Sequence, residues 1–223
     1  MLRREKDWFG YLGLAEDARA SFAEAMVQVR SIFVPGMMHE TDISSLVTVC
    51  VHARPRTVFE IGTYKGASAE LFLRALPQAK VISIAYPLDP EKGREFNNSD
   101  LRAEDIGSLV SPANRSRYTQ LLGDSHKIDP DAFVRDHGQV DLVFIDGDHS
   151  REGVRLDTEL ALRILAPGGA IAWHDANPKR RYLDSRRYLE EDMTLLALAT
   201  TDDFIGGIAY WTAALEQRLR SGG

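Results

Sequence analysis

The sequence has very little cysteine and no long apolar run. Cys50 is the only cysteine, so no disulfide can form within the chain, and a reducing compartment is expected. No apolar stretch approaches the roughly 20 residues that a membrane-spanning helix needs, and the N-terminus lacks the continuous apolar segment of a secretory signal. We therefore expect a soluble cytoplasmic protein whose 223 residues suffice for one α/β domain with additions.

An excess of positive charge and two common phosphate-binding motifs are also missing. The 27 lysines and arginines are outnumbered by 33 acidic residues, and the net charge of -6 argues against a general nucleic-acid binder. The Gly-x-Gly-x-x-Gly pattern of dinucleotide sites does not occur, which disfavours a nucleotide-dependent oxidoreductase. A P-loop would end in Gly-Lys-Ser/Thr, whereas Lys65 here precedes Gly66 and Ala67.

The most informative feature that is present is a strand followed by a glycine-bearing turn. Residues 57–61 are mostly apolar or β-branched, and Gly62 and Gly66 follow before a helix expected over 66–76. Such a turn lets a ligand approach the backbone at a helix N-terminus. The carboxylate of Glu60, at the end of the strand, suits a hydroxyl or an ammonium group better than a phosphate. A purely structural turn is the alternative that this motif alone leaves open.

The rest of the chain alternates between short apolar runs and amphipathic segments. Repeated strand–helix units of this kind predict a mostly parallel sheet with helices on both faces. We expect further strands at 80–85, 118–122, 140–145 and 170–173, helices near 130–136 and 150–165, a long loop with one short helix over 89–116, and an antiparallel hairpin of 194–199 and 205–211.

The N-terminal part of the chain is predicted to be helical. One helix is expected over 15–33, and a second begins where Thr41 can cap it. The aromatic cluster over residues 8–12 could pair subunits, so a homodimer is one option for the oligomeric state. We divide the chain into a helical segment of residues 1–54 that packs on the core as a lid or an interface, a main domain of residues 55–215, and a tail of residues 216–223.

Polar side chains follow the expected strands at the points where the strands end. In open α/β sheets, ligands bind outside the carboxyl ends of the strands, so we expect the functional site at this edge. The residues that lie there are Glu60, Asp124, Asp146, Asp148, His149, His174 and Asp175.

These motifs together resemble a known family. The pattern Glu60-x-Gly62-x-x-x-Gly66, the segment 141–150 and the segment from Pro167 to Asp175 are similar to those of class I S-adenosylmethionine-dependent methyltransferases. The resemblance runs from about residue 34 to residue 212 and is to the group related to antibiotic and sugar O-methyltransferases, more distantly to catechol O-methyltransferases. It implies a Rossmann-like, seven-stranded, mostly parallel sheet whose last strand is antiparallel, and O-methylation of a small-molecule hydroxyl such as that of a natural product or a sugar.

The resemblance also implies roles for individual residues. Gly62 and Gly66 would lie along the methionine part of the cofactor with Glu60 near its amino group, and Thr63 and Ser68 would be polar contacts there. The segment that contacts adenine would include Asp124 and Ser125, and Asp146 would lie beneath the sulfonium.

Two routes to activating the acceptor hydroxyl stay open. A Mg²⁺ ion held by Asp146 and Asp175, which resemble metal ligands of metal-using relatives, could lower its pKa. Alternatively, His149 or His174 acts as a general base, because imidazole titrates near neutral pH. The catalytic candidates are thus His149, His174 and Asp175. A structural role is the alternative for His174, and helix capping is the alternative for Asp148.

One position departs from the family pattern. Relatives normally end the second strand with an acid that holds the ribose hydroxyls, and Ala85 occupies that place, with Asp89 four residues further on. Losing such a carboxylate costs on the order of 1–3 kcal/mol of charged hydrogen bonding, or roughly tenfold to a hundredfold in affinity. This departure motivates a second hypothesis, a catalytically silent methyltransferase-fold protein that works in binding or assembly.

Overall fold

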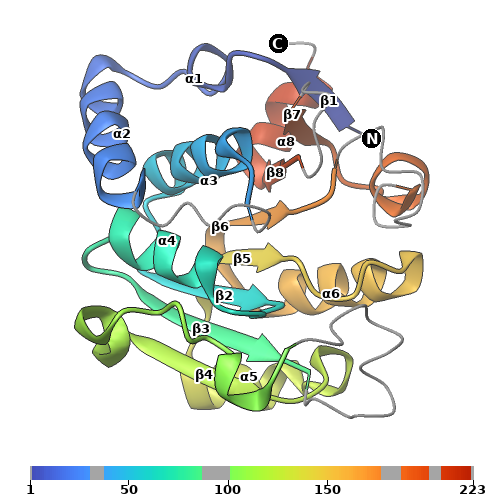
Figure 1. Cartoon of the computed structure of the whole chain (residues 1–223). Helices are drawn as coiled ribbons and strands as arrows, with labels where there is room; N and C mark the ends of the chain where they lie inside the picture. Colours follow the sequence, from blue (N-terminus) through green and yellow to red (C-terminus); the bar gives the residue numbers. More distant parts are fainter. Residues whose placement is uncertain (1, 31–37, 87–100, 177–186, 201–206, 222–223) are drawn as a thin grey trace.

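The computed structural model describes residues 2–30, 38–86, 101–176, 187–200 and 207–221, which form an α/β fold around one sheet (Figure 1). The sheet has eight strands in the order β1-β7-β8-β6-β5-β2-β3-β4. The strands are β1 (Leu2–Glu5), β2 (Thr57–Ile61), β3 (Lys80–Ala85), β4 (Tyr118–Leu122), β5 (Val140–Ile145), β6 (Leu165–Trp173), β7 (Ala197–Thr200) and β8 (Ala209–Thr212).

The strand directions confirm the expected Rossmann-like arrangement. Strands β4, β3, β2, β5 and β6 pair in parallel, and β8 runs antiparallel to both β6 and β7. The expected closing hairpin is therefore present, apart from residues 201–206, which lie outside the described part of the chain. The sheet has one strand more than expected, because β1 pairs in parallel with β7. Its sequence Leu-Arg-Arg-Glu contains too little apolar character to predict a strand.

Helices cover both faces of this sheet. One hydrophobic cluster joins the sheet to α2 (Glu16–Val29), α3 (Glu40–Ala53), α4 (Ala67–Ala75) and the short α1 (Trp8–Tyr11), and α8 (Ala213–Arg220) reaches it through Leu215. The other cluster joins the sheet to α5 (Pro130–His137) and α6 (Arg151–Ile164). Along β5, Leu142 and Phe144 belong to the first cluster while Val143 and Ile145 belong to the second, as the alternation of a strand requires. Single-turn or short helical segments are η2 (Ala103–Asp105), η3 (Pro112–Arg117), η4 (Ser125–Lys127) and η5 (Tyr188–Asp192).

Most element boundaries agree with the sequence prediction, and the exceptions have local causes. The second N-terminal helix is capped by His39, whose Nδ1 accepts from the backbone N–H of Thr41, so Thr41 lies inside the helix and is not its cap. Strand β6 starts at Leu165, earlier than expected, and its pairing with β5 shifts register between Leu165 and Ala170. The described part of the expected 89–116 loop contains two short 3-10 helices where one short helix was expected.

The proposed division of the chain at residues 54 and 215 stays a prediction. Helix α8 extends to Arg220, so most of the segment treated as a tail is helical. None of the helices in the described ranges combines the length and the apolar composition that crossing a bilayer requires.

Candidate active site

The first strand-to-helix turn depends on its glycines for packing. Gly62 and Gly66 have positive φ angles of 102° and 86°. A Cβ atom on Gly62 would lie 2.1 Å from the backbone oxygen of Asp146, and one on Gly66 would lie 3.0 Å from the Cα of Gly107. The turn therefore packs directly against the backbone that follows β5 and against the segment before β4. This close packing requires glycine at both places, whether or not a cofactor approaches them.

Glu60 lies beneath this turn in a buried polar network. The residue is fully buried, and its two carboxylate oxygens accept from the hydroxyls of Ser68 and Ser83. The Ser83 hydroxyl lies 2.6 Å from that of Thr63, which accepts from Nε2 of Gln120 at 2.9 Å. The structure thus brings the predicted residues Glu60, Thr63 and Ser68 together. It adds Ser83 and Gln120, whose only sequence signal is a polar residue inside a predicted strand.

The buried position of Glu60 makes stability depend on pH. Burial raises the pKa of Glu60 to about 7, and the nearby Asp146 adds to this, although the Ser68 and Ser83 hydrogen bonds act in the opposite direction. Because the folded-state pKa lies above that of the unfolded chain, the protonated group favours folding below about pH 4.5, and this advantage is lost as the pH rises through about 7. We expect the wild type to lose about 3 kcal/mol more than Glu60→Gln across that window.

Urea unfolding at pH 5 and pH 8 measures this difference. The exposed Glu24 on α2 offers a matched control, because Glu24→Gln should keep the pH dependence of the wild type. An equal pH dependence for the wild type and Glu60→Gln would show that Glu60 does not titrate as its surroundings imply.

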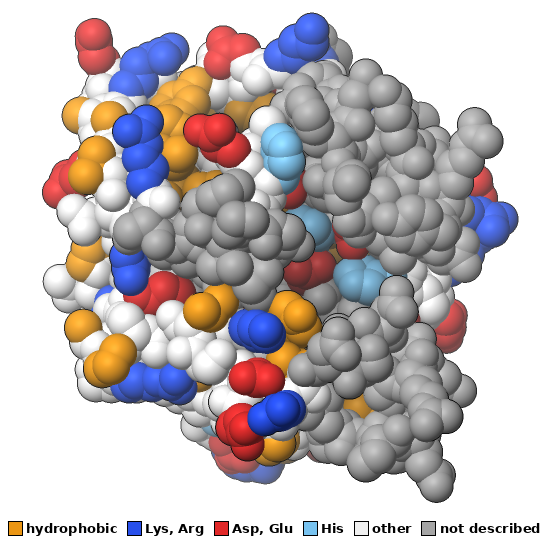
Figure 2. All heavy atoms as spheres, in the orientation of Figure 1, with side chains coloured by type: hydrophobic (Ala, Val, Ile, Leu, Met, Phe, Trp, Pro, Cys, Tyr) orange, Lys and Arg blue, Asp and Glu red, His pale blue; other side chains and the backbone are white. Residues whose placement is uncertain are grey.

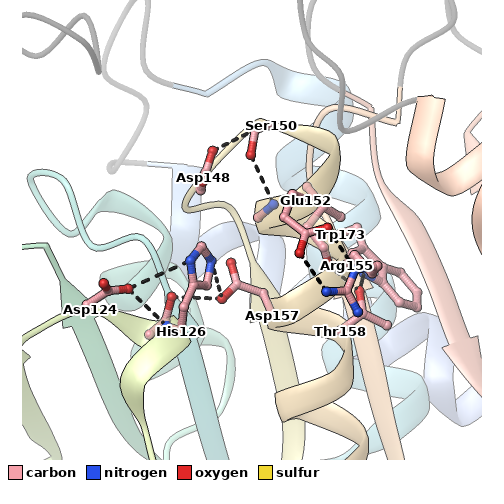
Figure 3. A network of polar contacts seen from close by, with 12 residues as sticks. Asp124, His126, Asp148, Ser150, Glu152, Arg155, Asp157, Thr158 and Trp173 are labelled. Atoms are coloured by element: carbon pink, nitrogen blue, oxygen red, sulfur yellow. Dashed lines mark hydrogen bonds and ion pairs between the residues drawn. The ribbon is translucent and has the colours of Figure 1, made fainter.

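A second polar network follows β4 and reaches α6 (Figure 3). Asp124 caps η4 by accepting from the backbone N–H of His126 at 3.1 Å, and the Ser125 hydroxyl donates to Oδ1 of Asp157 at 2.7 Å. Asp157 is fully buried, and its Oδ2 has no hydrogen-bond partner among the described residues. The contact of His126 with Asp157 raises the pKa of the imidazole. The predicted residues Asp124 and Ser125 therefore lie together, and Asp157, which was not assigned to this site from the sequence, is the partner of Ser125.

The acids and histidines after β5 and β6 form one cluster, and Figure 2 shows histidine and acidic side chains side by side near the middle of this face. Nδ1 of His149 lies 2.9 Å from Oδ2 of Asp175. Nδ1 of His174 lies 3.3 Å from Oδ1 of Asp146 and 3.3 Å from Oδ1 of Asp175. Asp175 is buried and has a positive φ of 56°. The structure brings the three predicted catalytic residues and Asp146 together.

Helix α3 adds an acid that the sequence analysis missed. Asp42 is 2% exposed, its Oδ2 lies 3.5 Å from Nε2 of His174, and its Oδ1 accepts from the backbone N–H of Gly207 at 2.8 Å. An acidic residue in the first turn of a helix is ordinary, because it suits the helix dipole. No sequence signal therefore separates Asp42 from a solvated capping residue.

Opposite charges in the cluster stabilise each other. Burial alone would lower the pKa of both histidines, but the carboxylates around them outweigh it: the pKa of His174 is well above its usual value and that of His149 is raised. Burial would raise the pKa of Asp175, yet its contacts with His149 and His174 bring it below its usual range. The side chain of His149 is 42% exposed and that of His174 only 14%, so His149 is better placed to meet a substrate.

Three residues of this cluster could hold a metal ion. Asp146, His149 and Asp175 each offer one ligand atom, and these atoms lie within 4.8 Å of one another. Two carboxylates and an imidazole suit a divalent cation, although Mg²⁺ prefers oxygen ligands. The donor set therefore fits the predicted pair Asp146 and Asp175 and adds His149, which must lose its proton to bind metal.

Two further positions singled out from the sequence are Asp148 and Ala85. Oδ1 of Asp148 accepts from the backbone N–H of Ser150 at 2.8 Å, and the Ser150 hydroxyl caps α6 by accepting from Gly153 at 2.9 Å. Asp148 thus shapes the turn before α6, and Ser150 is the cap. Ala85 is buried at the end of β3, and Asp89, which could replace its missing carboxylate, lies outside the described residues.

The chain has similar relatives among curated proteins and solved structures. The O-methyltransferase TomG from Streptomyces achromogenes has a similar fold, with a TM-score of 0.54, 20% identity, and coverage of 89% of this chain and 90% of that chain. The O-methyltransferase from Bacillus cereus gives a TM-score of 0.53, 17% identity, and coverage of 92% and 95%. The uncharacterized protein y4gI of Sinorhizobium fredii is 27% identical over 144 residues, which are 63% of this chain but only 15% of that relative's length.

A match to a family model identifies the family of the chain. The model, described as a methyltransferase domain, matches residues 59–176, just over half of the chain. The matched segment begins inside β2, ends just after Asp175, and contains most of the polar residues described above. The resemblance to class I methyltransferases that the sequence motifs carry is thereby confirmed, and the chain belongs to the methyltransferase domain family.

Proposed function

We propose that this methyltransferase moves a methyl group from S-adenosylmethionine to a hydroxyl group of a small molecule. The observation that carries the proposal is the cluster of His149, Asp175 and Asp146 at the carboxyl ends of β5 and β6. The similar O-methyltransferases support it, since TomG is described in complex with S-adenosylmethionine and the Bacillus cereus enzyme in complex with S-adenosylhomocysteine. A cytoplasmic location and a homodimer stay predictions from the sequence.

The cofactor would lie along the carboxyl ends of β2, β3, β4 and β5. Glu60 would support the turn of Gly62 and Gly66 from beneath it, because both of its oxygens accept hydrogen bonds from serine hydroxyls and the residue is buried. The residues proposed to bind or support the cofactor are Glu60, Gly62, Thr63, Gly66, Ser68, Asp124, Ser125 and Asp146.

His149 would take the proton of the acceptor hydroxyl. Asp175 holds Nδ1 of the imidazole at 2.9 Å, which leaves Nε2 as the atom that would meet the substrate. A fixed carboxylate partner orients the ring and stabilises the imidazolium that forms when the proton arrives. Asp42, Asp146 and Asp175 surround His174, so we assign His174 to holding these acids in place.

A divalent cation would be held by Asp146, His149 and Asp175. When bound, such an ion would lower the pKa of the acceptor hydroxyl. Because a ligating His149 cannot also serve as a base, the two routes are distinguishable: activity that EDTA abolishes and Mg²⁺ restores supports the metal route.

Transfer of labelled methyl from S-adenosylmethionine to a panel of phenols and sugars tests the proposal. We expect label in at least one product with the wild type and none with Asp175→Asn. Binding of S-adenosylhomocysteine without transfer to any acceptor would favour the catalytically silent protein instead.

Ala85 offers a prediction about affinity. Ala85→Asp should restore a carboxylate near the ribose hydroxyls and tighten S-adenosylhomocysteine binding by roughly tenfold to a hundredfold. Ala85→Asn, which is similar in size and uncharged, should gain less, because hydrogen bonds to neutral groups are weaker. Calorimetric titration measures both. If Ala85→Asp binds S-adenosylhomocysteine no more tightly than the wild type, the ribose hydroxyls do not lie beside residue 85.

A further inference from the structure

The turn after β6 holds Asp175 in a conformation that few residues adopt. Its positive φ of 56° costs a residue with a Cβ atom about 1–2 kcal/mol. Such conformations persist only where the surrounding structure fixes them, and they are frequent in active sites. The carboxylate of Asp175 lies 2.9 Å from Nδ1 of His149. The contacts that fix the backbone of Asp175 therefore also fix the partner of the proposed base.

The backbone of Ala176, the next residue, is held through both of its polar groups. Its N–H donates to the oxygen of Gly207 at 3.1 Å, and its oxygen accepts from Nη2 of Arg4 at 3.0 Å. Gly207 is fixed in turn, because its own N–H donates to Oδ1 of Asp42 at 2.8 Å. Ala176 is fully buried, so leaving its oxygen without the arginine would cost about 1–3 kcal/mol.

Arg4 reaches this turn from β1, at the edge of the sheet opposite to β4 (Figure 1). It pairs with Ala199 of β7, which pairs with Ala209 of β8, and Ala209 pairs with Trp173 of β6. Directly paired side chains lie on the same face of a sheet, and both alanines belong to the hydrophobic cluster on the α5 and α6 face. Their small side chains leave room for the long arginine to extend across this face toward the end of β6.

Glu190 of η5 orients the guanidinium of Arg4. Its Oε1 accepts from the same Nη2 at 2.8 Å, so one nitrogen donates to the carbonyl of Ala176 and to this carboxylate. The two side chains are only 25% and 30% exposed, and the pair is therefore partly shielded from water. The neighbouring Arg3 points to the opposite face of β1, where its guanidinium lies 4.5 Å from the centroid of the Tyr11 ring.

We propose that Arg4 is a positioning residue of the active site, which holds the turn after β6 so that Asp175 meets His149. Arg4 acts through the carbonyl of Ala176. Its loss would release the peptide that follows Ala176, let Asp175 leave its positive φ, and move the carboxylate away from the imidazole. A misplacement of about 1 Å can lower a rate about a hundredfold. The effect on methyl transfer rests on the proposed function, whereas the effect on the turn does not.

Steady-state methyl transfer separates positioning from a merely structural role. Arg4→Met keeps an unbranched aliphatic chain but loses the donor, and it should lower kcat about 10- to 100-fold while KM for S-adenosylmethionine stays within about threefold. Arg4→Lys keeps a charged donor and should recover most of the lost rate. Arg3→Met removes the neighbouring arginine and should keep kcat within about threefold of the wild type. An Arg4→Met protein with the wild-type kcat would overturn the proposal.

Amide hydrogen exchange followed by NMR tests the turn without cofactor or acceptor. In Arg4→Met, the amide of Ala176 should exchange at least about tenfold faster than in the wild type, because its bond to Gly207 opens more often. The amide of Asp146, which donates to Ile61 at 2.8 Å, should keep its rate. Unchanged exchange at Ala176, or equal acceleration of both amides, would overturn the proposal. If the wild type transfers no methyl group, the proposed function fails, and exchange at Ala176 still decides the role of Arg4.

Discussion

Gly62→Ala is expected to destabilise the protein by more than about 3 kcal/mol or to prevent its folding. The added Cβ would lie 2.1 Å from the backbone oxygen of Asp146 and 2.9 Å from the Cα of Gly147, and the φ of 102° is itself unfavourable for alanine. Both contacts are with backbone, so relief requires the end of β2 to move away from the end of β5. Urea unfolding measured by circular dichroism gives the change in the free energy of unfolding.

Gly13→Ala separates backbone strain from the steric clash. Gly13 also has a positive φ, of 66°, but a Cβ there meets nothing within 4 Å. Its substitution should cost only about 1–2 kcal/mol. A Gly62→Ala protein as stable as Gly13→Ala would mean that the ends of β2 and β5 are not packed as closely as described.

His149→Gln is expected to lower kcat by about 10²- to 10⁴-fold, the usual contribution of a general base. Glutamine retains a polar side chain but cannot accept the proton. The pKa of His149 is raised, and a base must be neutral to act, so the wild-type rate should rise as the pH increases through that raised pKa. The variant should lack this rise. Steady-state methyl transfer across pH 6 to pH 9 checks both effects.

A second histidine serves as the matched control for this prediction. His137 ends α5 and packs against Phe133, with ring centroids 4.9 Å apart, away from the cluster. His137→Gln should keep kcat within about threefold of the wild type. If His149→Gln keeps the wild-type rate and pH profile, His149 is not the base, and acceptor activation must be assigned elsewhere.

The sheet and its helices could be predicted because their patterns are local. The strands at 57–61, 80–85, 118–122 and 140–145 occur where expected, since most residues of each are apolar, aromatic or β-branched. The edge strand β1 could not be predicted from Leu-Arg-Arg-Glu, because backbone pairing with β7 and not apolar periodicity holds it in place.

The candidate site could be predicted only for the residues that follow the strands. Polar residues that end parallel strands must meet at one edge, and this brought Asp146, His174 and Asp175 together. Asp42 reaches the same cluster from α3, and Asp157 reaches Ser125 from α6. These partners come from helices, whose approach to the sheet depends on packing between distant segments. Such packing leaves no pattern in the spacing of residues.

Calorimetric titration with S-adenosylhomocysteine tests most directly whether the edge over β2 to β5 is a cofactor site. The account predicts saturable binding of about one ligand per chain with a dissociation constant below about 1 mM, and weaker binding of S-adenosylmethionine to Asp146→Lys, because the lysine would place a positive charge beside the positively charged sulfonium. No binding at about 1 mM ligand to a chain shown by circular dichroism to be folded would contradict the account, because the carboxyl ends of these strands would then serve another purpose.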